Sequence, residues 1–322
     1  MKMKKEYLIL AILIIGLSFY LVFHKRDRTQ YELPVLQELP ASEITKIEIS
    51  KPEGSVVALE RKNDGWVLLP EGYPAETGKI SVILESIEKV TLTALVSEAQ
   101  SYERYGLGKE EKIGVKAWAG AKVKRDFEVG KAASSNQHTF VMVAGDGRVF
   151  HARENLRGRF DQTVDDLRDK SVLKFEPSEV EEIELNDAKR TVRLVRKPIP
   201  VEVSTSGGKE PSTGQASMVW ESSEGTADET KVTQVLSALS SLKCRAYIYD
   251  RKKGDFKDPV YTVTMKGLEV QMLSLFSKDE KNENNHPGVS SWNDSPFLIS
   301  EPQAKQIMLS LDHILKKPQK SE

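Results

Sequence analysis

Two stretches of this 322-residue chain carry the same short motifs in the same order. Each series opens with an alternating run, at 42–49 in the first copy and at 178–185 in the second. A second alternating run that ends in arginine follows, and then a run that contains a tryptophan, Trp66 or Trp220. A single match of this kind arises easily by chance, whereas the common order predicts two tandem modules of related structure. We expect both tryptophans to pack in the core, at equivalent positions.

An amphipathic helix is expected after the tryptophan run of each copy. Both helices have an acidic start, followed by apolar residues at i, i+3, i+4 and i+7, a spacing that places them on one helical face. These residues are Ile80, Ile83, Leu84 and Ile87 in the first copy, and Val232, Val235, Leu236 and Leu239 in the second. The pattern makes Leu84 equivalent to Leu236.

Beyond each helix the chain mostly alternates between apolar and polar residues, as strands do. Strands are predicted at 113–118, 123–129, 139–143 and 148–152 in the first copy, and at 261–265 and 270–276 in the second. Asp146-Gly147 lies between two of them and predicts a tight hairpin turn with a positive φ. A second helix is expected at 153–169, and a capping box at Ser300 begins the closing helix of the second copy. Each module is therefore predicted to be an antiparallel sheet with two helices, an α+β fold.

The second copy also carries an insertion at 197–217. It is rich in Pro, Gly, Ser and Thr, and it replaces the short turn at 62–64 of the first copy. This composition predicts a flexible loop between two strands.

An uncharged run at 7–23 precedes the repeat, with lysines before it and basic residues after it. As a helix it would span about 25 Å, close to the hydrocarbon core of a bilayer at about 30 Å. No small-residue cleavage site follows Phe23, so we expect an uncleaved transmembrane anchor that contacts the lipid bilayer, and not a signal peptide. The short N-terminal stub favours an orientation with the N-terminus inside and the bulk of the chain outside the cytoplasm, at a bacterial inner membrane.

The expected organisation follows the chain from this anchor. It comprises a cytoplasmic stub at 1–6, the anchor at 7–23, a linker at 24–40, the first module at 41–176, the second module at 177–315 and a disordered tail at 316–322.

The composition argues against nucleic-acid binding and against sites built from cysteines. The 47 basic residues are balanced by 48 acidic ones, so the chain lacks the basic excess of a nucleic-acid-binding protein. Its one cysteine, Cys244, provides neither a disulfide framework nor a cysteine-based metal site, and we expect it to be a buried apolar residue.

No motif for catalysis, and no cofactor or metal site, is found in the chain. His138 and His151 flank the predicted hairpin and could approach each other, but we interpret them as ordinary strand residues rather than as a zinc pair. Four acidic residues on the predicted helix, Asp161, Asp165, Asp166 and Asp169, are interpreted as a solvated charged face and not as calcium ligands.

An ordered set of motifs extends over about residues 40 to 300. It includes the N-terminal anchor, Ile47-Glu48-Ile49, Trp66, Pro70, Ala75-Glu76, Tyr105-Gly106-Leu107, Phe127-Glu128-Val129-Gly130-Lys131, Leu167-Arg168-Asp169-Lys170 and Phe175. The set resembles a membrane-anchored bacterial family of unknown function, whose genes often lie beside a gliding-motility-type ABC transport system. The resemblance implies an extracytoplasmic partner of a transporter, such as its ABC subunits, and it brings no catalytic residues.

Tyr102, Tyr105 and Leu107 form the candidate binding loop, because aromatic residues in loops favour interfaces. The alternative is a loop that packs onto its own sheet. It has no clear counterpart in the second copy, where 247–250 is nearest. The leading hypothesis is thus a non-enzymatic, anchored interaction module, accessory to an ABC-type transport or envelope-assembly system. The alternatives are a protein that binds an envelope glycan or peptide in a cleft between the modules, and a hydrolase with an unrecognised carboxylate pair.

Overall fold

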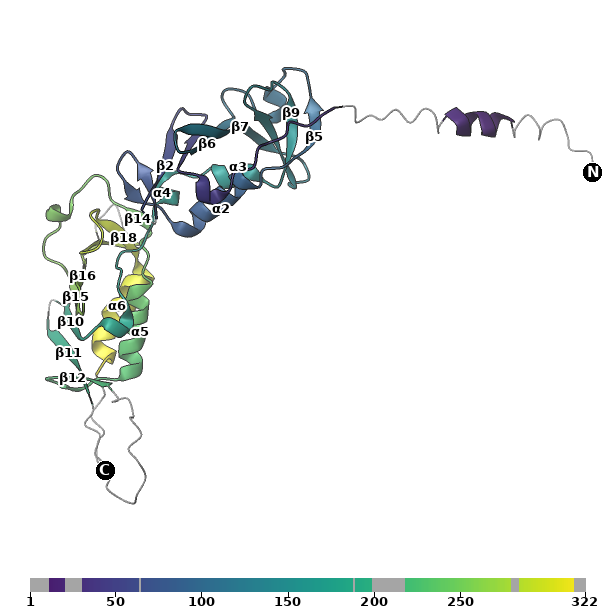
Figure 1. Cartoon of the computed structure of the whole chain (residues 1–322). Helices are drawn as coiled ribbons and strands as arrows, with labels where there is room; N and C mark the ends of the chain where they lie inside the picture. The colour runs from purple at the N-terminus through teal and green to yellow at the C-terminus, as the bar shows by residue number, and fades with distance from the viewer. Residues whose placement is uncertain are drawn as a thin grey trace, which may run out of the picture. The chain divides into compact units, whose positions relative to one another are not determined.

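The computed structural model describes residues 12–20, 31–63, 65–187, 189–198, 218–278 and 284–315. The chain divides into two compact units, residues 1–163 and 164–322, whose elements are labelled in Figure 1. This division lies before the boundary at 176/177 that we expected from the sequence. Val172 and Leu173 account for the difference, because both are buried in the core of the second unit.

The first unit is built on a nine-stranded antiparallel sheet with the order β4-β3-β2-β1-β6-β7-β8-β9-β5. Its strands are β1 (Lys46–Ser50), β2 (Val56–Lys62), β3 (Gly65–Leu69), β4 (Tyr73–Pro74), β5 (Leu92–Ser97), β6 (Ile113–Ala119), β7 (Lys122–Ala132), β8 (His138–Val143) and β9 (Val149–Arg153). Its helices are α2 (Thr77–Glu88) and α3 (Leu156–Phe160), with 3-10 turns η1 (Ala41–Glu43) and η2 (Glu103–Tyr105).

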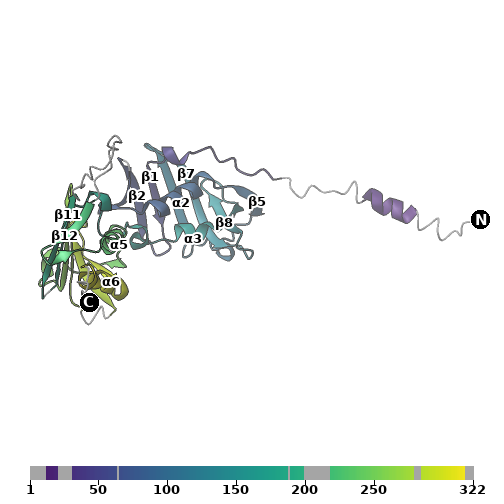
Figure 2. The same ribbon diagram turned by 90° about the horizontal axis from the view of Figure 1, so that it is seen from below.

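Alternation along the strands separates the two faces of this sheet. Ile47, Val115 and Phe127 are buried on one face, where α2 and α3 lie over the strands (Figure 2). Charged residues such as Glu48 of β1, Lys116 of β6 and Asp126 of β7 lie on the opposite face, which the helices leave uncovered, whereas Arg125 of β7 is on the same face as Phe127. The sheet therefore has one apolar face, which forms the core, and one polar face.

The second unit runs through the same succession of elements and has the sheet order β13-β12-β11-β10-β15-β16-β17-β18-β14. Its strands are β10 (Glu182–Asp187), β11 (Thr191–Pro198), β12 (Met218–Ser222), β13 (Gly225–Thr226), β14 (Ala246–Tyr247), β15 (Tyr261–Lys266), β16 (Val270–Leu275), β17 (Asn285–Ser290) and β18 (Phe297–Ser300). Its helices are α4 (Val164–Leu167), α5 (Glu229–Ser240) and α6 (Glu301–His313), with 3-10 turns η3 (Pro177–Glu179) and η4 (Lys253–Asp255). The mixed α+β class and the two antiparallel sheets are confirmed, and both sheets have one strand order.

The tryptophans occupy matching positions in the two sheets. Trp66 pairs with Arg61 across β2 and β3, and Trp220 pairs with Arg196 across β11 and β12. Trp220 is buried, as expected, whereas Trp66 is only half-buried, with the guanidinium of Arg61 5.2 Å from its ring. The predicted core position is therefore confirmed for Trp220, whereas Trp66 lies only partly in the core.

The two amphipathic helices also match. Both α2 and α5 have twelve residues, and Leu84 and Leu236 are the eighth residue of each. Each begins at an acidic N-cap whose carboxylate accepts a hydrogen bond from a backbone N–H of the first turn, Glu76 in α2 and Asp228 in α5. The capping box of α6 at Ser300 is present as well.

The structure corrects three local expectations. The helix predicted at 153–169 is two short helices, α3 and α4, because the chain passes from one unit to the other at 163/164 and the two halves of the apolar stripe belong to different units. In the β8–β9 turn the positive φ occurs at Gly145, at +81°, and not at Asp146-Gly147. The loop that contains η2 does have a counterpart, because η4 follows β14 as η2 follows β5.

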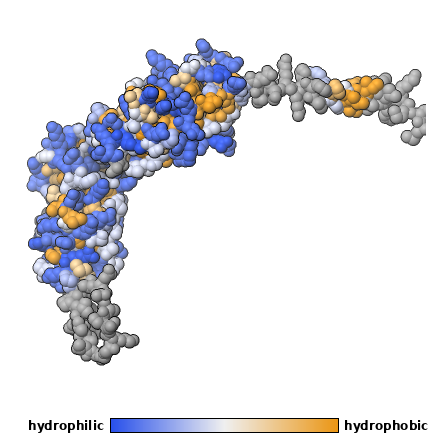
Figure 3. All heavy atoms as spheres, in the orientation of Figure 1, coloured by the Kyte–Doolittle hydropathy of each residue, from blue (hydrophilic) through white to orange (hydrophobic). Residues whose placement is uncertain are grey.

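Residues 12–20 of the expected anchor are helical, and all of them are exposed. The apolar residues of this helix are the orange part of the N-terminal segment in Figure 3. Among the helices of the described residues, none has both the length and the apolar character needed to cross a membrane. The structure does not describe the other anchor residues, the stub, the tail or residues 199–217 of the predicted insertion. Within the expected linker, residues 31–40 have no regular secondary structure, but Leu39 is buried.

Candidate functional site

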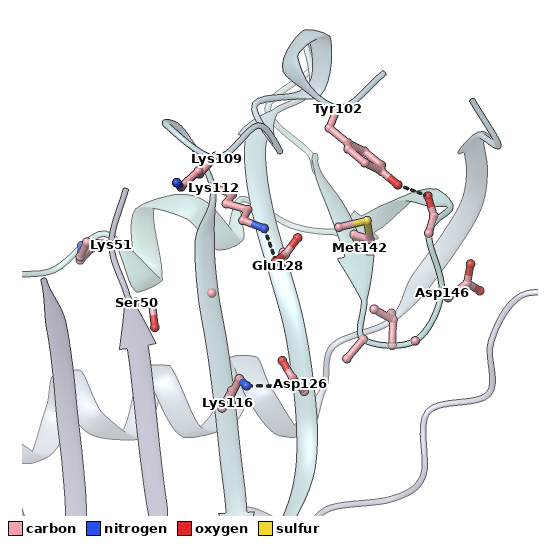
Figure 4. A pocket seen from close by; sticks show the side chains of 15 residues that line it. Ser50, Lys51, Tyr102, Lys109, Lys112, Lys116, Asp126, Glu128, Met142 and Asp146 are labelled. Carbon is pink, nitrogen blue, oxygen red and sulfur yellow. Dashed lines mark hydrogen bonds and ion pairs between the residues drawn. The ribbon is translucent and has the colours of Figure 1, made fainter. Parts of the chain in front are cut away.

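The open face of the first sheet carries a groove of about 570 Å³ between the η2 loop and the β8–β9 turn (Figure 4). Strands β1, β6, β7 and β8 form its floor. Its lining consists of Ser50, Lys51, Tyr102, Lys109, Lys112, Gly114, Lys116, Asp126, Glu128 and Met142, with the turn residues 143–147. Four of these residues are lysines and three are acidic, so the groove is a charged site.

Cross-strand pairs hold two of the lysines in place. Lys116 and Asp126 are directly opposite in the β6–β7 register, and their charged groups are 3.3 Å apart. Lys112, just before β6, donates a hydrogen bond to Glu128 Oε1 on β7. Figure 4 shows the two pairs along neighbouring strands. Partly exposed pairs of this kind add little stability, but they orient the side chains that line the groove.

The other two lysines differ from this pattern and from each other. Lys51 is buried, and its ammonium group is 2.7 Å from Asp161 Oδ1, so it stabilises the end of α3. Lys109 is exposed and forms no ion pair with any of the described residues. Lys109 is therefore the lysine of the groove that is most available to an incoming anion.

Two acidic residues of the groove, Asp146 and Glu128, are held by basic partners. Asp146 accepts hydrogen bonds from Nε and Nη2 of Arg148 at 3.0 and 2.7 Å, and these bonds lower the pKa of its carboxyl group. Glu128 Oε1 is bound to Lys112, whereas its Oε2 is buried without a hydrogen-bond partner. The groove thus has one carboxylate oxygen that no described protein group satisfies.

Of the three predicted binding residues, only Tyr102 lines the groove. Its hydroxyl donates a hydrogen bond to Gly147 O at 3.1 Å, which closes one end of the groove. The ring of Tyr105 packs against Phe140 at 5.0 Å between centroids. Leu107 is 2 % exposed, so its side chain stabilises the loop and is not accessible to a partner.

Close backbone contacts attach this loop to its own sheet, which is the alternative considered for it above. A Cβ atom at Gly130 would lie 2.3 Å from Tyr105 O, and one at Gly106 would lie 2.9 Å from the backbone nitrogen of Lys131. Gly106 also has φ +64°, a conformation that glycine adopts at little cost. The tertiary structure thereby brings together two motifs, at 105–107 and 127–131, that are far apart in the sequence.

Our sequence interpretation missed the lysines of the groove. A signal was present, because pairing the predicted strands at 113–118 and 123–129 as a hairpin would place Lys116 and Asp126 on its polar face. Lys109 had no such signal, since it lies in a loop.

The other residue groups considered from the sequence form ordinary contacts. The rings of His138 and His151 are 5.5 Å apart, and burial, together with the charge of His138, lowers the pKa of His151. Asp165 forms an ion pair with Lys170 at 3.1 Å. Among the described residues, no group of three or more His, Cys, Asp and Glu side chains is placed to bind a metal ion. Cys244 is buried as expected, and burial raises the pKa of its thiol to about 11.

One known protein family matches the chain. A family described as a domain of unknown function, DUF4340, matches residues 66–261, which is more than half of the chain. The chain belongs to the DUF4340 family. No curated protein and no solved structure matches it. The part that matches DUF4340 contains Tyr102 and the lysines at 109, 112 and 116, whereas Ser50 and Lys51 lie before it.

Proposed function

We propose that this DUF4340 chain is a non-enzymatic interaction module, anchored in the inner membrane of a bacterium and exposed outside the cytoplasm, where it serves an ABC-type transport or envelope-assembly system. The apolar run at 7–23, with basic residues on both sides, supports the anchor. The resemblance to proteins encoded beside gliding-motility-type transporters supports the class of partner. The observation that carries the proposal is the charged groove on the open face of the first sheet.

The groove has the features of a recognition site for an acidic polypeptide segment. Lys109, Lys112 and Lys116 place three ammonium groups along the groove and not at one point, and Lys112 and Lys116 are held there by their ion pairs with Glu128 and Asp126. Lys109 has no partner among the described residues, and its ammonium group can donate up to three hydrogen bonds to a carboxylate. Charges at an accessible site mainly raise the association rate and select the partner.

The chemistry of the groove favours binding over catalysis. A hydrolase that uses two carboxyl groups needs one of them protonated at neutral pH, which requires a raised pKa. The pKa of Asp146 is lowered by its hydrogen bonds with Arg148, which is the opposite direction. Its carboxylate is also already occupied by the guanidinium group, so Asp146 is suited to shaping the turn and not to transferring a proton.

The test is co-purification with the subunits of a gliding-motility-type ABC transporter from the same bacterium, after co-expression of all components and extraction with a mild detergent. The full chain should retain the subunits, and Lys109→Glu should raise the dissociation constant about tenfold, which corresponds to about 1.4 kcal/mol, and so lower the retained amount. Lys189→Glu is the matched control, because Lys189 is an exposed lysine of the second unit.

Salt provides a second measure of the same interaction, since exposed charges are screened over about 10 Å at 0.1 M salt. Retention by the unmodified chain should fall as salt increases. If the unmodified chain retains no transporter subunit, the proposed function is wrong. If Lys109→Glu and Lys189→Glu behave alike, the groove is not the contact surface.

A further inference from the structure

A second cavity, of about 250 Å³, lies on the helix-bearing face of the first sheet. Successive residues of a strand point to opposite faces, so Arg125 and Phe127 of β7 face this cavity while Asp126 and Glu128 carry their side chains to the open face. The cavity is bounded by the segment 35–37, by residues after α2 and by the ends of β7 and β8. Its apolar lining includes Leu36, Val90, Leu92, Phe127, Val141 and Val143.

Arg125 is the charged residue that makes this cavity unusual. Its side chain lines the cavity although the residue is only 6 % exposed. Its Nε atom is buried without a hydrogen-bond partner, and its one described hydrogen bond is a long contact of 3.5 Å from Nη1 to the neighbouring Lys124 O. No acidic side chain of the described residues lies within ion-pair distance of it.

A buried arginine without an anionic partner opposes folding, because its charge loses hydration and gains little in return. Burial accordingly lowers the pKa of Arg125. Asp126 also lines the cavity, but its carboxylate pairs with Lys116 at 3.3 Å, and the C-terminal end of α2, just before Val90, adds only the partial negative charge of a helix dipole. The fold therefore keeps a costly cation at the wall of an apolar cavity, and this arrangement calls for an external anion.

We propose that this cavity binds a small amphiphilic monocarboxylate, with its carboxylate on Arg125 and its aliphatic chain among the apolar side chains. The planar guanidinium group matches a carboxylate with two parallel hydrogen bonds. The lining holds two cations, Arg125 and Lys124, and one acidic residue, Asp126, so its net charge of one compensates one negative charge and a dianion such as phosphate would leave charge unpaired. The volume equals that of about eight water molecules at about 30 Å³ each, which suits a chain of about eight carbons.

This cavity shares Asp126, Val143 and Ala144 with the groove, but none of the lysines at 51, 109, 112 and 116, and Arg125 does not line the groove, so variants at Arg125 and Lys109 test the two sites separately. The two proposals therefore fail or succeed separately.

Octanoate is the probe that tests the inference. The full chain is reconstituted in nanodiscs, and binding of labelled octanoate is measured by equilibrium dialysis after subtraction of empty nanodiscs. We expect one octanoate per chain, and at least tenfold weaker binding of octanol, which lacks the carboxylate, and of acetate, which lacks the chain.

Arg125→Met should lower octanoate affinity at least tenfold while its unfolding temperature stays the same or rises, because the uncompensated charge is removed. Arg125→Lys should bind with intermediate affinity, since it keeps the charge but loses the planar fork. Lys122→Met is the matched control, because Lys122 is an exposed cation of the same strand that does not line the cavity, and it should bind like the unmodified chain.

Four outcomes would overturn the inference. The first is an unmodified chain that binds no octanoate, and the second is Arg125→Met binding as tightly as the unmodified chain. The third is octanol or acetate binding as tightly as octanoate. The fourth is a lower unfolding temperature for Arg125→Met, which would show that the protein itself compensates the charge and that Arg125 serves the fold.

Discussion

Replacing Gly130 with alanine should detach the loop that carries Tyr102 from the first sheet. The new Cβ atom would lie 2.3 Å from Tyr105 O, 3.0 Å from Leu107 Cγ and 3.2 Å from Phe140 O. Two of these contacts are with backbone oxygens, so rotation of a side chain cannot relieve them. Tyr105 O must withdraw by about 1 Å to reach an ordinary contact distance, and the loop must move with it.

The expected cost of this displacement is about 1–3 kcal/mol, as for other insertions of a methyl group into a packed site. For a unit of this size, each kcal/mol lowers the unfolding temperature by about 2–4 °C. Calorimetry of the full chain should therefore show a transition lowered by about 2–12 °C. Amide hydrogen exchange should show faster exchange at 102–112, because the hydrogen bonds of η2 depend on the attached loop.

Gly114→Ala is the matched control on the neighbouring strand β6. Its new Cβ atom would lie 3.5 Å from Ser50 Cβ, an ordinary contact, so its effect should stay within about 0.5 kcal/mol. Equal unfolding temperatures and equal exchange at 102–112 for the two variants would refute the close packing of the loop on Gly130.

Two further predictions concern pH and the repeated arginines. The pKa of His151 is lowered, chiefly by burial and then by the charge of His138, so the unfolded chain binds more protons than the folded one as pH falls through 6.5. Stability of the first unit should therefore decrease between about pH 7.5 and about pH 5.5 in urea unfolding, and by less in His151→Gln; an equal decrease in both proteins would contradict the assignment. Arg61 donates two hydrogen bonds to carbonyl oxygens of η1, at 2.9 and 2.8 Å, whereas Arg196 donates one to η3, at 2.7 Å. Arg61→Lys should therefore cost more than Arg196→Lys, with each lost bond worth about 0.5–1.5 kcal/mol in urea unfolding, and the reverse order would show that these bonds do not hold the turns.

The repeat was predictable because its motifs are local. Alternation and helical spacing depend only on neighbouring residues, so they identify β1, β2, β3 and α2, and the same elements again in the second unit. Ile80 and Ile87 are buried on α2 as their spacing predicts, and Val232 and Leu239 are buried on α5. The shared sheet order then follows from repeating one series of elements.

The prediction of a single helix at 153–169 was wrong because it too rested on local spacing alone. Leu156, Phe160, Val164 and Leu167 have the spacing of one amphipathic helix. Periodicity does not show that α3 belongs to the first unit and α4 to the second. The break between them could be recognised only from the packing of each half.

By itself, the sequence determined the class of the fold, the order of its elements and which face of each strand is apolar, because these properties depend on short-range spacing. It did not determine the groove, which combines residues between 50 and 147, or the burial of Arg125 without an anionic partner. The tertiary structure decided both, since strand register places Lys116 opposite Asp126 and the packing around the end of β7 buries a cation without a partner. Burial and charge pairing are properties of neighbours in space, and in an antiparallel sheet those neighbours come from distant parts of the chain.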